Sequence, residues 1–272
     1  MAVQDVTWKE TNDEFVAQEI THDALDKQDT NNANDYNLEF DYEELDQKIV
    51  LREKSEANQS TGLALWTCSQ VLTGFLLDNQ EYVKDQTVLE IGAGLGLCGI
   101  VAHHLGAKQV LSTDGDVDVL NNLRHNIELN RLDRFRQEYN EYDGEEKKEC
   151  DLDDSIEEGE ASILSPQLIW NKNLDSFQEQ YGKQSVMMGT DIFYFESSLE
   201  PGWKTIDKLL KPDGVFLLGF CPHSVSIEQV LDTARSYGFS YEKPNITGGV
   251  EEDEDFATSC SFGYHVFVFR RE

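Results

Sequence analysis

The chain has 272 residues, and 39% of them are hydrophobic, which is enough for one large domain with a substantial core. Its formal net charge of −31 excludes nucleic-acid binding through a broad basic surface, because phosphate binding needs clustered lysine and arginine side chains. The five cysteines contain no C-x-x-C pair, which is typical of free thiols in a reducing compartment, and no signal peptide, transit peptide or membrane span is visible. We therefore expect a cytoplasmic or nuclear protein that does not bind membranes, with a monomer as the default.

Most of the negative charge lies in three segments that contain few apolar residues. Residues 1–46 hold 14 acidic residues and two lysines, residues 138–160 hold 12 acidic residues and two lysines, and residues 251–255 are all acidic. Segments of this composition rarely pack into a core. We expect a disordered extension at residues 1–46, a folded domain at residues 47–272, and an acidic insertion at residues 138–160 within that domain. The acidic segments either attract a basic protein partner or only keep the chain soluble.

The hydrophobic pattern predicts strands that alternate with helices along the chain. We expect a strand at residues 49–53, a helix at 61–75 that Gly74 interrupts, a strand at 87–91, a helix at 97–105, a strand at 109–113 and a helix at 117–129. Beyond the acidic insertion, we expect strands at 167–170 and 185–189, a helix at 203–210, a strand at 215–220, a helix at 226–237, and strands at 240–242 and 264–271. This order predicts an α/β fold with a parallel sheet and helices on both faces, closed by a C-terminal antiparallel strand pair.

The most informative segment is residues 88–99, where a short apolar strand runs into a glycine-rich turn and then opens a helix. Glycines let a ligand approach the backbone closely, and the first helical N–H groups then face that ligand. Such a turn binds nucleotide-like cofactors in α/β sheets. The spacing Gly94-x-Gly96-x-x-Gly99, with Asp114 about 20 residues beyond the strand, also fits a dinucleotide-binding fold.

Two details favour a different cofactor. The turn begins at Gly92, before the dinucleotide pattern starts, and Glu90 lies inside the strand. A buried carboxylate is costly unless it meets hydrogen-bond donors or a cation. S-adenosylmethionine (SAM) carries an ammonium and a sulfonium group, whereas Glu90 would repel a pyrophosphate. We therefore expect SAM, and a nicotinamide oxidoreductase is a distant alternative.

The ends of the other predicted strands supply the remaining candidate residues. Asp114 can accept hydrogen bonds from both ribose hydroxyls of an adenosine, although an acid there also suits the start of the next helix. Trp170 can stack on adenine or belong to the core. Asp191 and Tyr194 can both face a transferred methyl group, or serve as a turn acid and a packed aromatic residue. The histidines offer no metal-binding arrangement and no nucleophilic triad.

The elements named so far, together with a few shorter motifs, resemble the seven-strand (class I) SAM-dependent protein lysine methyltransferases. The motifs are Thr61-Gly-x-x-x-Trp66, Glu90-x-Gly-x-Gly-x-Gly96, Thr113-Asp114, Leu168-x-Trp170, Gly189-x-Asp191-x-x-Tyr194 and Lys211-Pro-Asp-Gly214. The resemblance covers roughly residues 49–272 and implies a Rossmann-like seven-strand sheet. It implies a SAM site formed by Trp66, Glu90, Gly92, Ala93, Gly94, Gly96, Asp114, Trp170 and Thr190, with Asp191 and Tyr194 at the methyl acceptor.

The resemblance implies methyl transfer from SAM to a lysine side chain of a protein substrate. Two departures concern the acceptor side: the insertion at residues 138–160, and Gly219-Phe-Cys-Pro-His223 where a more polar segment is expected. A few relatives modify arginine or histidine, which these motifs do not exclude. A small-molecule methyltransferase is an alternative, but its usual long insertion is apolar. A catalytically weak SAM-binding assembly factor is a further alternative.

Overall fold

The structure is a computed structural model that describes residues 6–10, 15–19, 36–54, 61–130, 162–245 and 263–272. The acidic segments predicted at residues 138–160 and 251–255 lie outside these residues. Within the described part of the chain, no helix is long and apolar enough to cross a membrane.

A seven-stranded sheet forms the centre of the fold, with the strand order β10-β11-β9-β8-β5-β6-β7. Its strands are β5 (Thr87–Ile91), β6 (Gln109–Thr113), β7 (Ser162–Leu164), β8 (Gln184–Thr190), β9 (Leu210–Phe220), β10 (Phe239–Glu242) and β11 (His265–Arg271). The pairs among β5, β6, β7, β8 and β9 are parallel, whereas β11 is antiparallel to both β9 and β10. The predicted parallel sheet with a C-terminal antiparallel pair is therefore confirmed.

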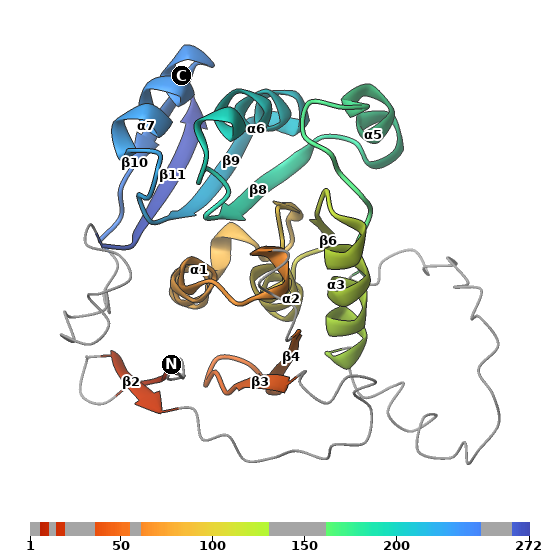
Figure 1. Cartoon of the computed structure of the whole chain (residues 1–272), viewed down its shortest axis with the longest axis vertical. Coiled ribbons are helices and arrows are strands. Elements are labelled where there is room, and N and C mark those ends of the chain that lie inside the picture. The colour runs from red at the N-terminus through yellow and green to blue at the C-terminus, as the bar shows by residue number, and fades with distance from the viewer. Residues whose placement is uncertain (1–5, 11–14, 20–35, 55–60, 131–161, 246–262) are drawn as a thin grey trace.

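Helices cover both faces of this sheet (Figure 1). One face packs against α1 (Thr67–Asp78), α2 (Leu97–His104) and α3 (Val117–Leu129), and the other against α5 (Leu174–Tyr181), α6 (Glu196–Leu209) and α7 (Ile227–Ser236). Strand β5 shows how the sequence divides the core, because successive side chains of a strand point to opposite faces. Val88 joins the first cluster, while Leu89 and Ile91 join the second, and all three are fully buried.

Two short strand pairs lie outside the main sheet. Strands β1 (Val6–Glu10) and β2 (Phe15–Glu19) pair with each other, as do β3 (Tyr36–Phe40) and β4 (Ile49–Glu53). In the second pair, Leu38 and Phe40 are buried in the core cluster beneath α1 and α2. The predicted domain boundary at residue 47 is therefore too late, because alternating apolar side chains inside the acidic stretch are enough to pack β3 against the domain.

Some predicted elements differ in the structure. The strand expected at residues 167–170 is wrong, since the edge strand is β7 and Gln167 makes only an isolated bridge to Asp114. Pro166 has no backbone N–H and interrupts the ladder between them. Helix α1 runs through Gly74 to Asp78 and does not break there. Helix α6 starts at Glu196, before the predicted start, and contains Pro201.

Candidate functional site

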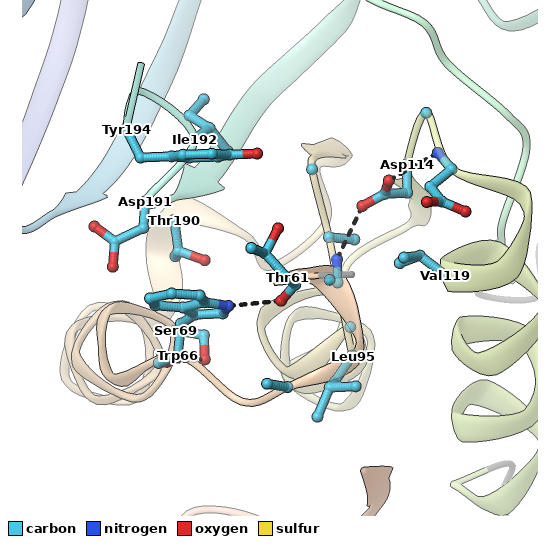
Figure 2. Close-up of a pocket in the computed structure, with 18 of the residues that line it drawn as sticks. Thr61, Trp66, Ser69, Leu95, Asp114, Val119, Thr190, Asp191, Ile192 and Tyr194 are labelled. Atoms are coloured by element: carbon cyan, nitrogen blue, oxygen red, sulfur yellow. Dashed lines mark hydrogen bonds between the residues drawn. The ribbon is translucent and has the colours of Figure 1, made fainter. Parts of the chain in front are cut away.

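A cavity of about 750 Å³ opens at the carboxyl ends of β5, β6 and β8 (Figure 2). Ligands of open α/β sheets bind at this edge, where the strand order reverses. The walls come from residues 61, 62 and 64–66 before α1, residues 92–97 after β5, residues 114–116 after β6, residues 168–170, residues 190–192, 194 and 195 after β8, and Ser69, Val119, His223 and Ser224.

The structure brings almost all of the predicted site residues to this one cavity. Those that line it are Trp66, Gly92, Ala93, Gly94, Gly96, Asp114, Trp170, Thr190, Asp191 and Tyr194. Glu90 is the exception. No group of histidine, cysteine, aspartate and glutamate residues in the described part of the chain could hold a metal ion.

Glu90 lies behind the cavity and not in its wall. It is 3% exposed, and one of its carboxylate oxygens accepts hydrogen bonds from the Ser112 hydroxyl and from the Gly99 backbone N–H, the latter at 3.1 Å. The predicted contact with the cofactor therefore needs correction. Alternation along β5 directs Glu90 to the same face as Val88, under the first turn of α2. Burial raises its pKa to about 7.

The backbone of the glycine-rich turn adopts a conformation that favours glycine. Gly92, Gly94 and Gly96 have φ values of 65°, 56° and 87°. At Gly92, an added Cβ would lie 2.9 Å from Ile192 and 3.5 Å from Trp170. Glycine at this position therefore lets Ile192 and Trp170 pack closely against the backbone of the turn.

Asp114 directly follows β6 and lies beside the glycine-rich turn (Figure 2). Its two carboxylate oxygens accept hydrogen bonds from the N–H groups of Gly94, at 3.2 Å, and Asp116, at 3.0 Å. Burial raises the pKa of Asp114, and these hydrogen bonds oppose that rise. Asp116, and not Asp114, caps α3 by accepting the Asp118 N–H at 2.8 Å. The carboxylate of Asp114 is therefore free of a helix-capping role, and its remaining lone pairs suit the two hydroxyls of a ribose.

Asp191 is held firmly at the other end of the cavity. Its φ of 50° is unusual for a residue with a side chain. Its N–H donates to the Gly219 carbonyl, and its carboxylate accepts the Cys221 N–H, both at 2.9 Å. The Cys68 thiol also hydrogen-bonds this carboxylate, whose pKa burial raises. The hydrogen bonds to Gly219 and Cys221 hold Asp191 in this conformation, and uncommon backbone conformations of this kind cluster at functional sites.

Aromatic side chains surround Asp191 at the mouth of the cavity. Figure 2 shows the rings of Trp66 and Tyr194 on opposite sides, with Asp191 and Thr190 between them. Trp66 is 44% exposed and Tyr194 is 40% exposed, and Phe195 beside Tyr194 is 59% exposed. Large exposed aromatic side chains at a cavity mouth mark a surface that another molecule covers.

Sequence reasoning missed several parts of the wall. The sequence pattern predicts a helix that starts at Thr61, but Thr61 and Gly62 form a short 3₁₀ turn (Thr61–Leu63) that packs against the glycine-rich turn and Val119. His223, in the segment that departs from the family pattern, lines the cavity as well. These contacts join segments far apart in the sequence, and no local pattern indicates them.

Comparison with known proteins agrees with this geometry. A family model described as lysine methyltransferase matches residues 44–140. The chain is 27% identical over 196 residues to the protein N-terminal and lysine N-methyltransferase EFM7 of Yarrowia lipolytica, covering 68% of each chain. It is 28% identical to the protein-lysine N-methyltransferase EFM3 of Chaetomium thermophilum, covering 57% of this chain and 40% of the relative.

Shorter and more distant matches extend the comparison. The histone-arginine methyltransferase METTL23 of Xenopus laevis is 33% identical over 88 residues, covering 32% of this chain and 38% of that protein. A solved structure of the T. thermophilus 16S rRNA methyltransferase RsmC, in complex with AdoMet and guanosine, superposes with a TM-score of 0.54 and 13% identity. The superposition covers 89% of this chain and 52% of the RsmC chain. At this level of identity, the similarity supports the fold alone. Residues 44–140 are therefore similar to the lysine methyltransferase family, and the relatives of this chain include enzymes named as protein lysine N-methyltransferases.

Proposed function

We propose that this protein transfers a methyl group from SAM to the side-chain nitrogen of a lysine in a protein substrate. The observation that carries the proposal is one continuous cavity with Asp114 at one end and Asp191 with Tyr194 at the other. The first end suits an adenosine, and the second suits a cationic acceptor. The names of the Yarrowia and Chaetomium relatives, both lysine methyltransferases, support the same acceptor.

The cofactor end fits SAM in shape and in hydrogen-bonding groups. The cavity bordered by the glycine-rich turn can admit the cofactor, Trp170 can stack on its adenine, and Asp114 can accept hydrogen bonds from its ribose. Bound there, SAM supplies a methyl group on a positively charged sulfur, which is a good leaving group.

At the acceptor end, the main task of the protein is to position the lysine and to exclude water. A lysine must be neutral to react, and with an ordinary pKa near 10.4 its deprotonation at pH 7 costs about 4–5 kcal/mol. Asp191 favours the charged ammonium, so we assign it to capture and orientation of the lysine, with the proton leaving to water. Tyr194 and Trp66 would form the sides of a narrow channel around the alkyl chain.

The proposal includes a basic substrate segment. The described residues that line the cavity include the carboxylates of Asp114, Asp116 and Asp191, but neither lysine nor arginine. A positively charged peptide would therefore meet attraction and no like charge at the mouth.

The test combines labelling with a substitution that respects the backbone. Wild-type protein and Asp191→Asn are incubated with radiolabelled SAM and a lysate from cells that lack this protein. Asparagine tolerates a positive φ, so the variant removes the charge without new strain. We expect a protease-sensitive labelled band with wild type, most of it lost in Asp191→Asn, and cofactor affinity within a few-fold of wild type.

Other outcomes separate the alternatives. Mass spectrometry of the labelled band distinguishes a lysine side chain from an N-terminal amine, which the name of the Yarrowia relative also includes. Label confined to small molecules would favour a small-molecule methyltransferase, and cofactor binding without any label would favour an assembly factor. Unchanged turnover in Asp191→Asn would remove this residue from the mechanism.

A further inference from the structure

The β3–β4 hairpin stands outside the seven-stranded sheet, and helix α3 holds the edge of β4 that does not pair with β3. Asn130 accepts the Val50 N–H at 2.8 Å and donates to the Val50 carbonyl at 2.6 Å. Asn126 accepts the Arg52 N–H at 2.8 Å, and Asn122 donates to the Arg52 carbonyl at 3.0 Å. Asparagine side chains therefore replace a neighbouring strand.

The spacing of these asparagines explains why the arrangement works. They recur every four residues along α3 and its C-cap, Asn130, and four residues span about 6 Å along a helix axis. The backbone groups on one edge of a strand recur every two residues, which is about 6.6 Å. The two repeats match closely over this length, so successive asparagines meet successive free groups of β4. Asn122, Asn126 and Asn130 are 0%, 0% and 4% exposed, so these hydrogen bonds are shielded from water.

One of these asparagines also contacts the wall of the cofactor cavity. The side-chain amide of Asn126 also donates to the Leu95 carbonyl at 3.0 Å, inside the glycine-rich turn. One buried side chain thus joins β4, α3 and the turn. The hairpin has a fixed position relative to the part of the site that follows β5.

Glu53 connects the hairpin to the opposite wall of the cavity. It is the last residue of β4, and one carboxylate oxygen accepts the Leu65 N–H at 3.0 Å. The other oxygen accepts the Tyr36 hydroxyl at 2.7 Å, which orients the carboxylate. The next residue, Lys54, donates its N–H to the Leu63 carbonyl at 3.3 Å. Leu65 precedes Trp66, so the end of β4 holds the backbone of the segment that lines the cavity before α1.

We infer that Glu53 is a positioning residue of the cofactor site, and that the β3–β4 hairpin and its asparagines serve as its anchor. The carboxylate fixes the backbone at Leu65, and thereby the distance between this wall and the glycine-rich turn. Within the wall, the Trp66 indole N–H donates to the Thr61 carbonyl at 2.7 Å (Figure 2). This hydrogen bond ties the two ends of the wall segment together. The inference rests on the assignment of the cavity to SAM, and does not depend on the acceptor.

The test uses the full-length chain and S-adenosylhomocysteine as the probe. Three variants isolate the contact: Glu53→Ala removes both hydrogen bonds, Glu53→Gln keeps an oxygen for the Leu65 N–H, and Tyr36→Phe removes only the hydroxyl. A hydrogen bond to a charged group corresponds to roughly a tenfold change in an equilibrium constant. We expect the Kd from calorimetry to rise about tenfold in Glu53→Ala, with the rise in Glu53→Gln and Tyr36→Phe within about threefold.

Stability measurements separate positioning from a merely structural role. Glu53 is partly exposed, so we expect the three variants to share the melting temperature of the cofactor-free wild type within a few degrees. Wild-type affinity in folded Glu53→Ala would overturn the inference, as would an equal loss of affinity in Glu53→Gln and Glu53→Ala. Should Glu53→Ala not fold, Glu53→Asp, which retracts the carboxylate by one methylene, replaces it with the same expected loss of affinity. A wild type that did not bind the probe would instead overturn the assignment of the cavity.

Discussion

Replacing Glu90 with glutamine tests the electrostatics beneath the cofactor turn. The glutamine has the same shape, and its amide oxygen can accept the same hydrogen bonds from Ser112 and Gly99, but it does not titrate. Burial raises the pKa of Glu90 from 4.5 to about 7, although the two donors oppose the rise. The folded protein therefore holds the Glu90 proton at pH values where the unfolded chain has released it.

The sign of the effect follows from proton binding. Between pH 4.5 and about 7 the folded state binds more protons at Glu90 than the unfolded state, so the free energy of unfolding falls as the pH rises. The contribution of Glu90 is fully present below pH 4.5 and is lost by the time the pH has risen through 7. At 1.36 kcal/mol per pKa unit, the whole loss is about 3 kcal/mol, of which about 2 kcal/mol falls between pH 5.5 and 8.5.

Urea unfolding at pH 5.5 and pH 8.5, without cofactor, measures this difference. Both values lie above the isoelectric point of about 4.3, so the chain keeps a net charge and stays in solution. We expect the wild type to lose about 2 kcal/mol more than Glu90→Gln between the two pH values. The exposed Glu81, changed to glutamine, is the control, and it should leave the wild-type trend in place. Parallel pH trends in wild type and Glu90→Gln would refute the reasoning.

Two further substitutions test the cavity and the helix behind it. Asp114→Asn replaces a charged acceptor of the ribose with an amide, so the Kd for S-adenosylhomocysteine should rise about ten- to a hundredfold in calorimetry, and wild-type affinity would reject the ribose role. Gly99→Ala should lower the free energy of unfolding by about 1–3 kcal/mol, because the new Cβ would lie 2.5 Å from the Glu90 carboxylate and 2.7 Å from the Ser112 hydroxyl. Gly74→Ala is the matched control in α1, where a Cβ meets nothing within 4 Å, and it should raise stability by about 0.5–1 kcal/mol. Equal changes in the two glycine variants would contradict the packing argument.

The elements that sequence patterns predicted are those whose side chains face one or two apolar layers. Strands β5, β6 and β8 are buried on both faces, so their sequences are short apolar runs with clear ends. Strand β3 has no clear sequence signal because only two of its residues, Leu38 and Phe40, are buried, and they lie within an acidic stretch. Helix α5 was missed because it has only eight residues and few of them are buried.

The candidate site was predictable to the extent that it depends on the ends of strands. Asp114 directly follows β6, while Thr190 ends β8 and Asp191 follows it, and parallel strands bring their carboxyl ends to one edge. The charge of Glu90 suggested a contact with the cofactor. The alternation of side chains along β5 instead directs Glu90 under α2 and away from the cavity wall. Glu53 gave no local signal at all, because its role depends on contacts with residues that are distant in the sequence.

The third glycine of the Gly94-x-Gly96-x-x-Gly99 spacing shows why this turn resembles a dinucleotide site without being one. In this structure Gly99 lies inside α2, where its missing Cβ leaves space for the carboxylate of Glu90 and the hydroxyl of Ser112. Glycine at position 99 therefore makes room for a buried acid on β5, and it does not serve to bind a phosphate in the turn. A Cβ at position 99 would crowd the carboxylate of Glu90 in this packing, so a larger residue at position 99 should be tolerated better when residue 90 is smaller. The double variant Glu90→Ala with Gly99→Ala should thus be more stable than the sum of the single changes predicts.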